Sequence, residues 1–322
     1  MIIKRRLKDE LINKLQNDET FKVLWQLIVC DETLCPVFRN DKIDIYYRGY
    51  KLFSISCEGI LRNEQTFNNK IIDYNNHEYH GLNGNILHLE DNPTLEDFPY
   101  ILPFYKQNVD YWFGAGTKRA YEREFQQLML RENNSKKFGK YSDYYILEME
   151  YQYRTSGPEP DLMAVKMPRR KRQGKTYRLA IVEVKYLDDR FAGKAGIRSH
   201  IDDYIKLVNN KDMLNEVKNE MEIFFTQRKE LGLLQGYDSD KKQIKISDEK
   251  PELILALIGL NSNNGKNNHD EEVETLKKIL TDALDCYGSE LLDAVYIAQT
   301  SEMGFGLYED KMIKIADYKE TL

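Results

Sequence analysis

The chain has 322 residues, of which 41% are hydrophobic, 31% charged and 11% aromatic. This composition favours a soluble globular protein over a disordered or fibrous one, and the length suits two domains better than one. The net charge of −6 excludes a global attraction to nucleic acid, so any such binding must come from a local basic patch.

No apolar run approaches the roughly 20 residues that cross a bilayer, and the first residues resemble no secretory signal. We therefore expect a cytoplasmic protein with no membrane partner. Cys30 and Cys35 approach zinc-ligand spacing, but no second Cys or His pair follows. Together with Cys57 and Cys286 they are expected to be reduced thiols.

The sequence pattern of residues 1–105 predicts a small α+β domain. Its expected elements are a helix over 4–29 broken at Asn17–Asp18, a hairpin of strands 43–47 and 52–56, and short strands at 71–72 and 86–88. The hairpin mixes aromatic side chains with a cation (Tyr46, Tyr47, Arg48 and Tyr50), as single-strand binders do. Packing within a tyrosine-rich hairpin is the alternative.

An apolar segment at Pro99–Pro103 suggests a boundary, and residues 106–322 form the second predicted domain. Its expected elements are a helix from 116 or 117 to 132, strands at 144–153, 162–167 and 179–184, helices over 197–208 and 213–230, a buried strand over 253–260, a helix near 270–285, a strand at 294–299 and a hairpin near 308–311. Helical spacing places Glu124 on the apolar side of the first helix.

The main candidate catalytic residues lie between Glu159 and Lys185. Asp161 opens one strand of a hairpin, and the other strand contains Glu183 and Lys185. Because side chains alternate across a strand, Glu183 and Lys185 share one face. Two carboxylates beside a lysine suit Mg²⁺, which prefers hard oxygen ligands, and the lysine can hold water or charge on phosphorus. A cross-strand salt bridge is the structural alternative.

The order Pro160-Asp161, hairpin, Glu183-Val184-Lys185 resembles the two motif halves of the PD-(D/E)xK nuclease superfamily. The resemblance implies an α/β protein with a restriction-endonuclease-like αβββαβ core over roughly 115–262. It also implies that Asp161 and Glu183 bind Mg²⁺, or Mn²⁺ in its place, with help from the Val184 carbonyl. Lys185 would position the attacking water, and Glu124 would join the site unless it is a solvated helix residue.

His200 and Tyr204 lie four residues apart on the helix after the motif strand, where some branches of the superfamily carry Gln-x-x-x-Tyr to contact substrate. A packed core pair is the alternative. Between the motif strands, a run of basic residues could neutralise phosphates without reading sequence. These residues are Arg169, Arg170, Lys171, Arg172 and Lys175. A solvated loop is the default interpretation of such a run.

The leading hypothesis is a cytoplasmic, metal-dependent nuclease that hydrolyses phosphodiester bonds in nucleic acid, with DNA the favoured substrate and RNA left open, and that serves restriction, phage defence or repair. A nuclease-fold protein that binds nucleic acid or another subunit without cutting is the alternative. A third hypothesis is that the motif is coincidental and that the chain is a structural or interaction protein. The sequence leaves a homo-oligomer open.

Overall fold

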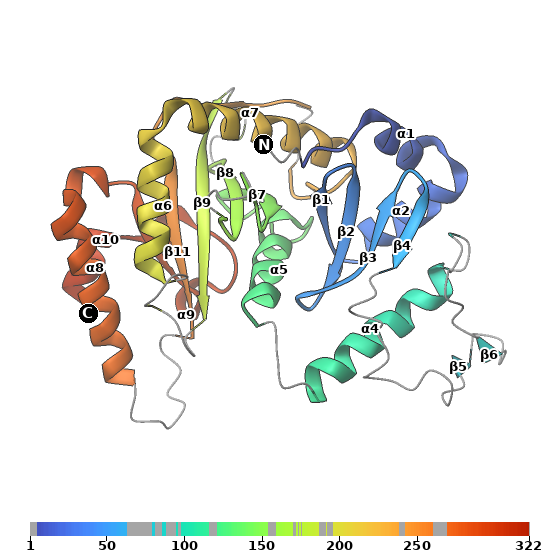
Figure 1. The fold of residues 1–322 in the computed structure, drawn as a ribbon, viewed down its shortest axis with the longest axis horizontal. Coiled ribbons are helices and arrows are strands. Elements are labelled where there is room, and N and C mark those ends of the chain that lie inside the picture. The colour runs from blue at the N-terminus through green and yellow to red at the C-terminus, as the bar shows by residue number, and fades with distance from the viewer. Residues whose placement is uncertain are drawn as a thin grey trace. The chain divides into compact units, whose positions relative to one another are not determined.

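The computed structural model describes residues 5–321 except 63–78, 81–85, 88–94, 96–97, 116–120, 154–158, 170–171, 173, 175, 187–190, 192–195, 238–241 and 260–268. The described chain is mixed α/β (Figure 1). Its contacts define an N-terminal unit, Lys4–Gln127, and a C-terminal unit, Leu128–Leu322. This division falls within helix α5 (Tyr121–Asn134), whereas the boundary predicted near residue 105 falls within helix α4 (Phe98–Ala115).

The N-terminal unit begins with helices α1 (Asp9–Asn17) and α2 (Glu19–Cys30). The break predicted at Asn17–Asp18 is confirmed. Asp18 has an extended backbone, and its carboxylate accepts hydrogen bonds from the N–H groups of Thr20 and Phe21, both at 3.1 Å. These bonds satisfy two of the donors that every helix start leaves unpaired, so α2 begins at this position.

An antiparallel sheet follows, in the order β1 (Cys35–Arg39), β2 (Lys42–Tyr47), β3 (Tyr50–Ser56) and β4 (Gly59–Arg62). The predicted β2–β3 hairpin is confirmed. Its two-residue turn has positive φ at Arg48 (48°) and Gly49 (82°), the twist that closes a tight hairpin. The sequence analysis missed β1, which contains Pro36, and β4. Pro36 is tolerated because β1 lies at the edge of the sheet.

Strands β5 (Tyr79–His80) and β6 (Ile86–Leu87) pair with each other, while the strand predicted at 71–72 lies outside the described residues. Helix α4 continues through the segment where Pro99–Pro103 suggests an interruption. Pro99 falls in the first turn, where its missing N–H costs nothing, and Pro103 removes one interior hydrogen bond. Burial of Ile101, Leu102 and Tyr105 offsets that loss.

The C-terminal unit contains the helix, three strands, helix and strand expected between residues 115 and 262. Its elements after α5 are β7 (Tyr144–Met149), β8 (Leu162–Lys166), β9 (Thr176–Tyr186), α6 (Ile197–Asn209), α7 (Lys211–Glu230), β10 (Lys245–Ile246), β11 (Glu252–Ile258), α8 (His269–Leu291), β12 (Val295–Gln299), α9 (Thr300–Met303), the 3-10 helix η1 (Glu309–Lys311), β13 (Ile313–Lys314) and α10 (Ile315–Thr321). The prediction of a hairpin near 308–311 is wrong. The 3-10 helix η1 occupies these residues, and β13, which follows η1, pairs with β12.

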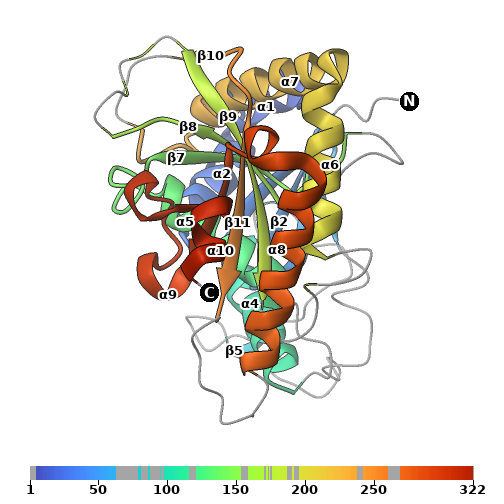
Figure 2. The ribbon, with the colours of Figure 1, turned by 90° about the vertical axis from the view of Figure 1, so that its left-hand side faces the viewer.

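These strands form one mixed sheet in the order β13-β12-β11-β9-β8-β7, with β10 added to β9. Strands β7, β8 and β9 are antiparallel, whereas β9, β11 and β12 are parallel. Every residue of β11 is buried, as expected for a strand covered on both faces. Helices α6 and α8 pack side by side (Figures 1 and 2).

Among the described residues, no helix combines the length and apolar character that crossing a bilayer requires. All four cysteines are free thiols, as expected.

Candidate active site on the mixed sheet

The pairing of β8 with β9 brings the two motif halves together. Leu162 lies opposite Val182 and Met163 opposite Ile181. Extending this register by one residue places Asp161 beside Glu183. Because directly opposed residues share a face and side chains alternate along each strand, Asp161, Glu183 and Lys185 occupy the same face of the sheet. We refer to these three residues as the motif cluster.

A hydrogen bond between the motif halves holds Asp161 in place. The Val184 N–H donates to Oδ2 of Asp161 at 2.7 Å. A strand residue directs its N–H and its C=O to the same side, so the Val184 carbonyl also faces the edge of β9 where Asp161 lies. Two carboxylates and one main-chain carbonyl therefore border the same short stretch of strand.

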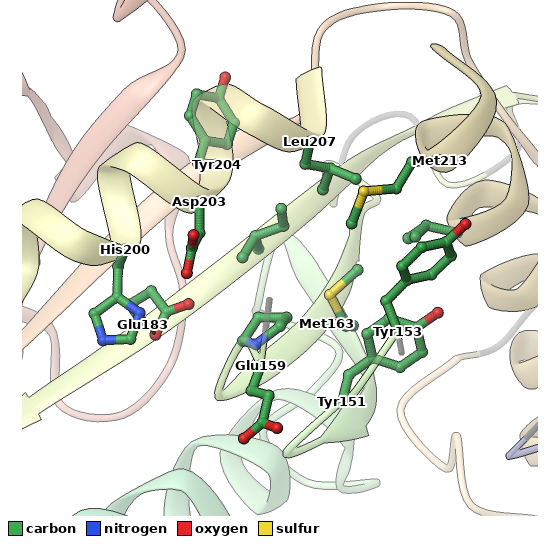
Figure 3. A pocket seen from close by; sticks show the side chains of 13 residues that line it. Tyr151, Tyr153, Glu159, Met163, Glu183, His200, Asp203, Tyr204, Leu207 and Met213 are labelled. Atoms are coloured by element: carbon green, nitrogen blue, oxygen red, sulfur yellow. Dashed lines mark ion pairs between the residues drawn. The ribbon is translucent and has the colours of Figure 1, made fainter. Parts of the chain in front are cut away.

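Glu183 and Lys185 are both buried, with 4% and 7% of their surfaces exposed. Removing charges from water is costly unless other charges or hydrogen bonds compensate for it. One polar neighbour comes from α6, where Nδ1 of His200 lies 3.0 Å from Oε2 of Glu183. Figure 3 shows these two side chains meeting, His200 from the helix and Glu183 from the strand.

A pocket of about 420 Å³, a volume that includes its open mouth, adjoins Glu183 and His200. Its apolar lining comes from β8, β9, α6 and α7: Met163, Ile181, Leu207, Met213 and Val217. Three carboxylates also contribute to the wall, those of Glu159, Glu183 and Asp203. The pocket therefore combines an apolar interior with acidic groups close to the motif cluster.

The rings of Tyr151 and Tyr153 form another wall of the pocket (Figure 3). The Tyr151 hydroxyl donates to Glu220 of α7 at 2.5 Å, and the Tyr153 hydroxyl donates to Glu216 on the same helix. Sequence analysis did not identify these tyrosines or Asp203 as site residues. Two signals could have found them: the i, i+2 spacing of the tyrosines, and the position of Asp203 three residues after His200 on one helix face.

Tyr204 has a bracing contact. Its ring lines the pocket, but its buried hydroxyl donates to the Pro251 carbonyl at 2.9 Å, and Figure 3 shows that hydroxyl directed away from the other labelled side chains. Burial raises the pKa of Tyr204, so the hydroxyl stays protonated and keeps donating. Tyr204 thus fixes α6 to the residue that precedes β11.

Glu124 belongs to the N-terminal unit and is paired within it. Its Oε1 lies 3.0 Å from Nε of Arg48, in the β2–β3 turn. The same guanidinium contacts Asp110 of α4 at 2.9 Å through NH1, and the Tyr47 hydroxyl donates to Asp110 at 3.1 Å. Arg48 therefore ties the hairpin to two helices through its contacts with Asp110 and Glu124.

Arg169 and Arg172, the described members of the basic run predicted to meet phosphate, lie at the opposite end of the hairpin from the motif cluster. Arg178, near the tip, is seven residues from Lys185, about 23 Å at ~3.3 Å per residue. Arg172 NH2 donates to the carbonyls of Gly139 and Ser142, at 2.9 and 2.6 Å. Arg169 contacts Asp143 and Asp310. Both described arginines thus hold the tip to the rest of the unit, while residues 170, 171 and 175 lie outside the described residues.

A second cluster of buried charge lies on the other face of the sheet, around Glu252. We call it the Glu252 cluster. Glu252 is fully buried, and its Oε1 contacts Lys166 at 2.8 Å and Arg178 at 3.0 Å. Its Oε2 accepts a hydrogen bond from the Tyr144 hydroxyl at 2.6 Å. Burial and the nearby Glu252 carboxylate raise the pKa of Tyr144 well above its ordinary value.

The motif cluster suits Mg²⁺ in the chemistry of its donors, since carboxylate and carbonyl oxygens are the ligands this ion prefers. Within the part of the chain that the structure describes, no group of three or more His, Cys, Asp or Glu side chains is arranged to hold a metal. Metal binding here would therefore rely on two carboxylates, with the main chain and water completing the coordination.

In comparisons with protein-family models, curated proteins and solved structures, no match to this chain was found. The functional argument therefore rests on the geometry of the site.

Proposed function

We propose that this protein is a metal-dependent nuclease that hydrolyses phosphodiester bonds in DNA, with a restriction-endonuclease-like core similar to that of the PD-(D/E)xK superfamily. The observation that carries the proposal is the hydrogen bond from the Val184 N–H to Asp161. It joins the Pro160-Asp161 half of the motif to the Glu183-Val184-Lys185 half, two segments separated by a hairpin in sequence. The strand order and the parallel β11 support the same core.

Asp161 and Glu183 would hold the divalent ion together with the Val184 carbonyl. Asp161 can do so while bonded to Val184, because a carboxylate has about four acceptor positions and this hydrogen bond uses one of them. A bound divalent ion supplies Lewis-acid stabilisation of the phosphate and makes water a stronger nucleophile. The two carboxylates also orient the substrate, because they repel a phosphate group in every position except the one where the bound ion offsets their negative charge.

Lys185 is the cationic member of the motif cluster. Its ammonium group has three donors, which can hold the attacking water and the negative charge that develops on the phosphate oxygens. Because Lys185 is largely buried, water screens its charge less than it screens a surface lysine. Its preset position on a central strand means that little reorganisation is needed when the substrate binds.

His200 positions Glu183. The Nδ1–Oε2 contact of 3.0 Å fixes the rotamer of the carboxylate from a different element of the fold. Partners of this kind orient the ligands of metal sites and contribute to their affinity. His200 is thus a positioning residue, and Tyr204 supports the helix that carries it through the Pro251 contact.

A nuclease-fold protein that binds nucleic acid or a partner without cutting is the second candidate. It is favoured by the lack of any three-residue metal group among the described side chains and by the position of His200, whose Nδ1 lies 3.0 Å from one oxygen of Glu183. The burial of Glu183 and Lys185 on one face favours the nuclease. Burying these charges costs desolvation free energy, and a protein that only binds has no need of them there.

A cleavage assay with linear, circular and single-stranded DNA and with RNA tests the proposal, in Mg²⁺ or Mn²⁺ and in chelator. We expect DNA cleavage that requires the ion and leaves a 5′-phosphate. Asp161→Asn is the decisive variant, since the amide oxygen can still accept from the Val184 N–H while the charge is lost. Cleavage that persists in chelator, or in Asp161→Asn at the wild-type rate, would reject the proposed mechanism.

A further inference from the structure

A lysine-aromatic loop, residues 135–142, makes up most of the connection between α5 and β7 in the C-terminal unit. Its exposed side chains are Lys136, Lys137, Phe138, Lys140 and Tyr141. Tyr141 is 54% exposed and Phe138 36% exposed. Only two other large apolar side chains of the described chain are exposed, Val23 and Tyr100. The loop therefore gathers exposed rings and cations within six consecutive residues.

Within the described part of the chain, the cations of this loop are not neutralised by acidic side chains. No interaction links Lys136, Lys137 or Lys140 to a carboxylate of the described residues. Two of them lie against the exposed rings instead, with Lys137 Nζ 5.1 Å from the centroid of Phe138 and Lys140 Nζ 4.9 Å from that of Tyr141. In a chain of net charge −6, three such lysines form a local positive surface.

The backbone of the loop is held rigidly. The Gly139 N–H donates to the Ser135 carbonyl at 2.9 Å, and the Tyr141 N–H donates to Phe138 at 2.8 Å. Gly236 packs so closely that a Cβ on it would lie 2.6 Å from the Ser135 carbonyl oxygen. The NH2 group of Arg172 donates to the Gly139 carbonyl at 2.9 Å. The exposed side chains therefore project from a preorganised backbone, which lowers the entropic cost of binding.

We propose that the lysine-aromatic loop is a binding surface for single-stranded nucleic acid, separate from the motif cluster. The lysines contact phosphates, and bases stack on Phe138 and Tyr141, the combination on which sequence-tolerant single-strand binding depends. The loop precedes β7, whose first residue Tyr144 pairs with Lys166 at the tip end of β8. It thus lies at the opposite end of the sheet from Asp161. The surface binds a strand without cutting it.

Fluorescence anisotropy tests this with a labelled oligothymidylate of about 16 nucleotides, the upper end of a single-module site. The full chain is used in chelator, so that no cleavage occurs. Replacing Lys136, Lys137 and Lys140 by Ala should weaken binding at least tenfold and lower the salt slope by about 2, given ~0.7 per neutralised phosphate. Phe138→Ala with Tyr141→Ala should weaken it by roughly thirtyfold or more, at ~1 kcal/mol or more per stacked base, and leave the salt slope unchanged.

The matched control replaces three exposed lysines elsewhere in the unit, Lys211, Lys245 and Lys278, and should bind like wild type. Asp161→Asn should also bind like wild type, and this outcome separates failure of the surface from failure of the nuclease proposal. Equal weakening in the control and loop variants would overturn the proposal, as would wild-type binding in the loop variants. Equal competition by polyglutamate would also overturn it, because the surface would then be a general anion site.

Discussion

Two clusters of buried charge lie on opposite faces of the same sheet, and they differ in how the charge is compensated. In the Glu252 cluster, one carboxylate contacts two cations and a tyrosine hydroxyl, and Lys166 also contacts Glu309 at 2.7 Å. In the motif cluster, two carboxylates share a face with one lysine, and one of them, Glu183, lines a pocket. The first pattern is that of a structural ion network, and the second places two carboxylates beside one lysine, a donor set to which a cation can bind.

The largest effect is expected when Lys185 is replaced. Lys185→Met keeps the length and apolar stem of the side chain and removes the ammonium group. We expect cleavage to fall about 10²- to 10³-fold, the cost of losing one donor that stabilises charge in a transition state. Single-turnover cleavage by the folded variant measures this.

Lys166→Met is the matched control, because Lys166 is also a strand lysine but belongs to the Glu252 cluster. It should retain the cleavage rate in its folded form and lose stability. Equal loss of activity in both lysine variants would remove the distinction between the two faces.

Glu252→Ala should destabilise the protein by roughly 3 kcal/mol, since removing one partner of a buried network leaves the others uncompensated. This loss of unfolding free energy lies at the lower end of the usual range for broken buried ion pairs. In the variant, Lys166 still contacts Glu309, and Arg178 still donates a hydrogen bond to the Lys250 carbonyl. Urea unfolding followed by circular dichroism measures it. Glu249→Ala serves as the control: its carboxylate lies 4.0 Å from the same Arg178 but is 69% exposed, so a change under about 0.5 kcal/mol is expected.

His200→Ala should lower activity or metal affinity about 10- to 100-fold, as loss of an outer partner of a ligand does. His200→Gln, which can still donate to Glu183, should recover part of the loss. Comparing the Mg²⁺ concentration for half-maximal cleavage in the two variants separates positioning from packing. Identical values in Ala and Gln variants would show that the Nδ1–Oε2 contact has no role in the site.

Alkaline conditions should weaken the Glu252 cluster by a smaller amount. Burial alone lowers the pKa of Lys166, but its contacts with Glu252 and Glu309 outweigh burial and raise it. A raised pKa in the folded state means that the contribution to stability is full below the unfolded value of 10.5 and is lost as pH rises through the folded value. The unfolding free energy of Lys166→Met should therefore vary less with pH above that value, as urea titrations at increasing pH would reveal.

The sequence was most informative where local chemistry determines structure. The Asn17–Asp18 break followed from a capping carboxylate, and the Arg48–Gly49 turn followed from hairpin chemistry. Tertiary effects explain the failures. Pro36 conceals a strand because only its edge position makes proline acceptable, and α4 tolerates Pro103 because its apolar face is buried.

The candidate site shows the same division. The shared face of Glu183 and Lys185 follows from strand alternation, and the structure adds the His200 contact and the pocket, which depend on how α6 and α7 pack against the sheet. The role of the basic tip in substrate binding stays a prediction. The basic residues lie between the two motif strands in sequence, but a hairpin places its turn at one end of the strands and Asp161 lies at the other end.

The most direct test of the central claim is a calorimetric titration of Mn²⁺ into the wild-type protein, Asp161→Asn, Glu183→Gln and Glu252→Gln. We predict saturable binding by wild type and by Glu252→Gln, and loss of that binding in both Asp161→Asn and Glu183→Gln. Equal binding by all four proteins, or none by wild type, would contradict the claim that the two motif carboxylates together form a metal site.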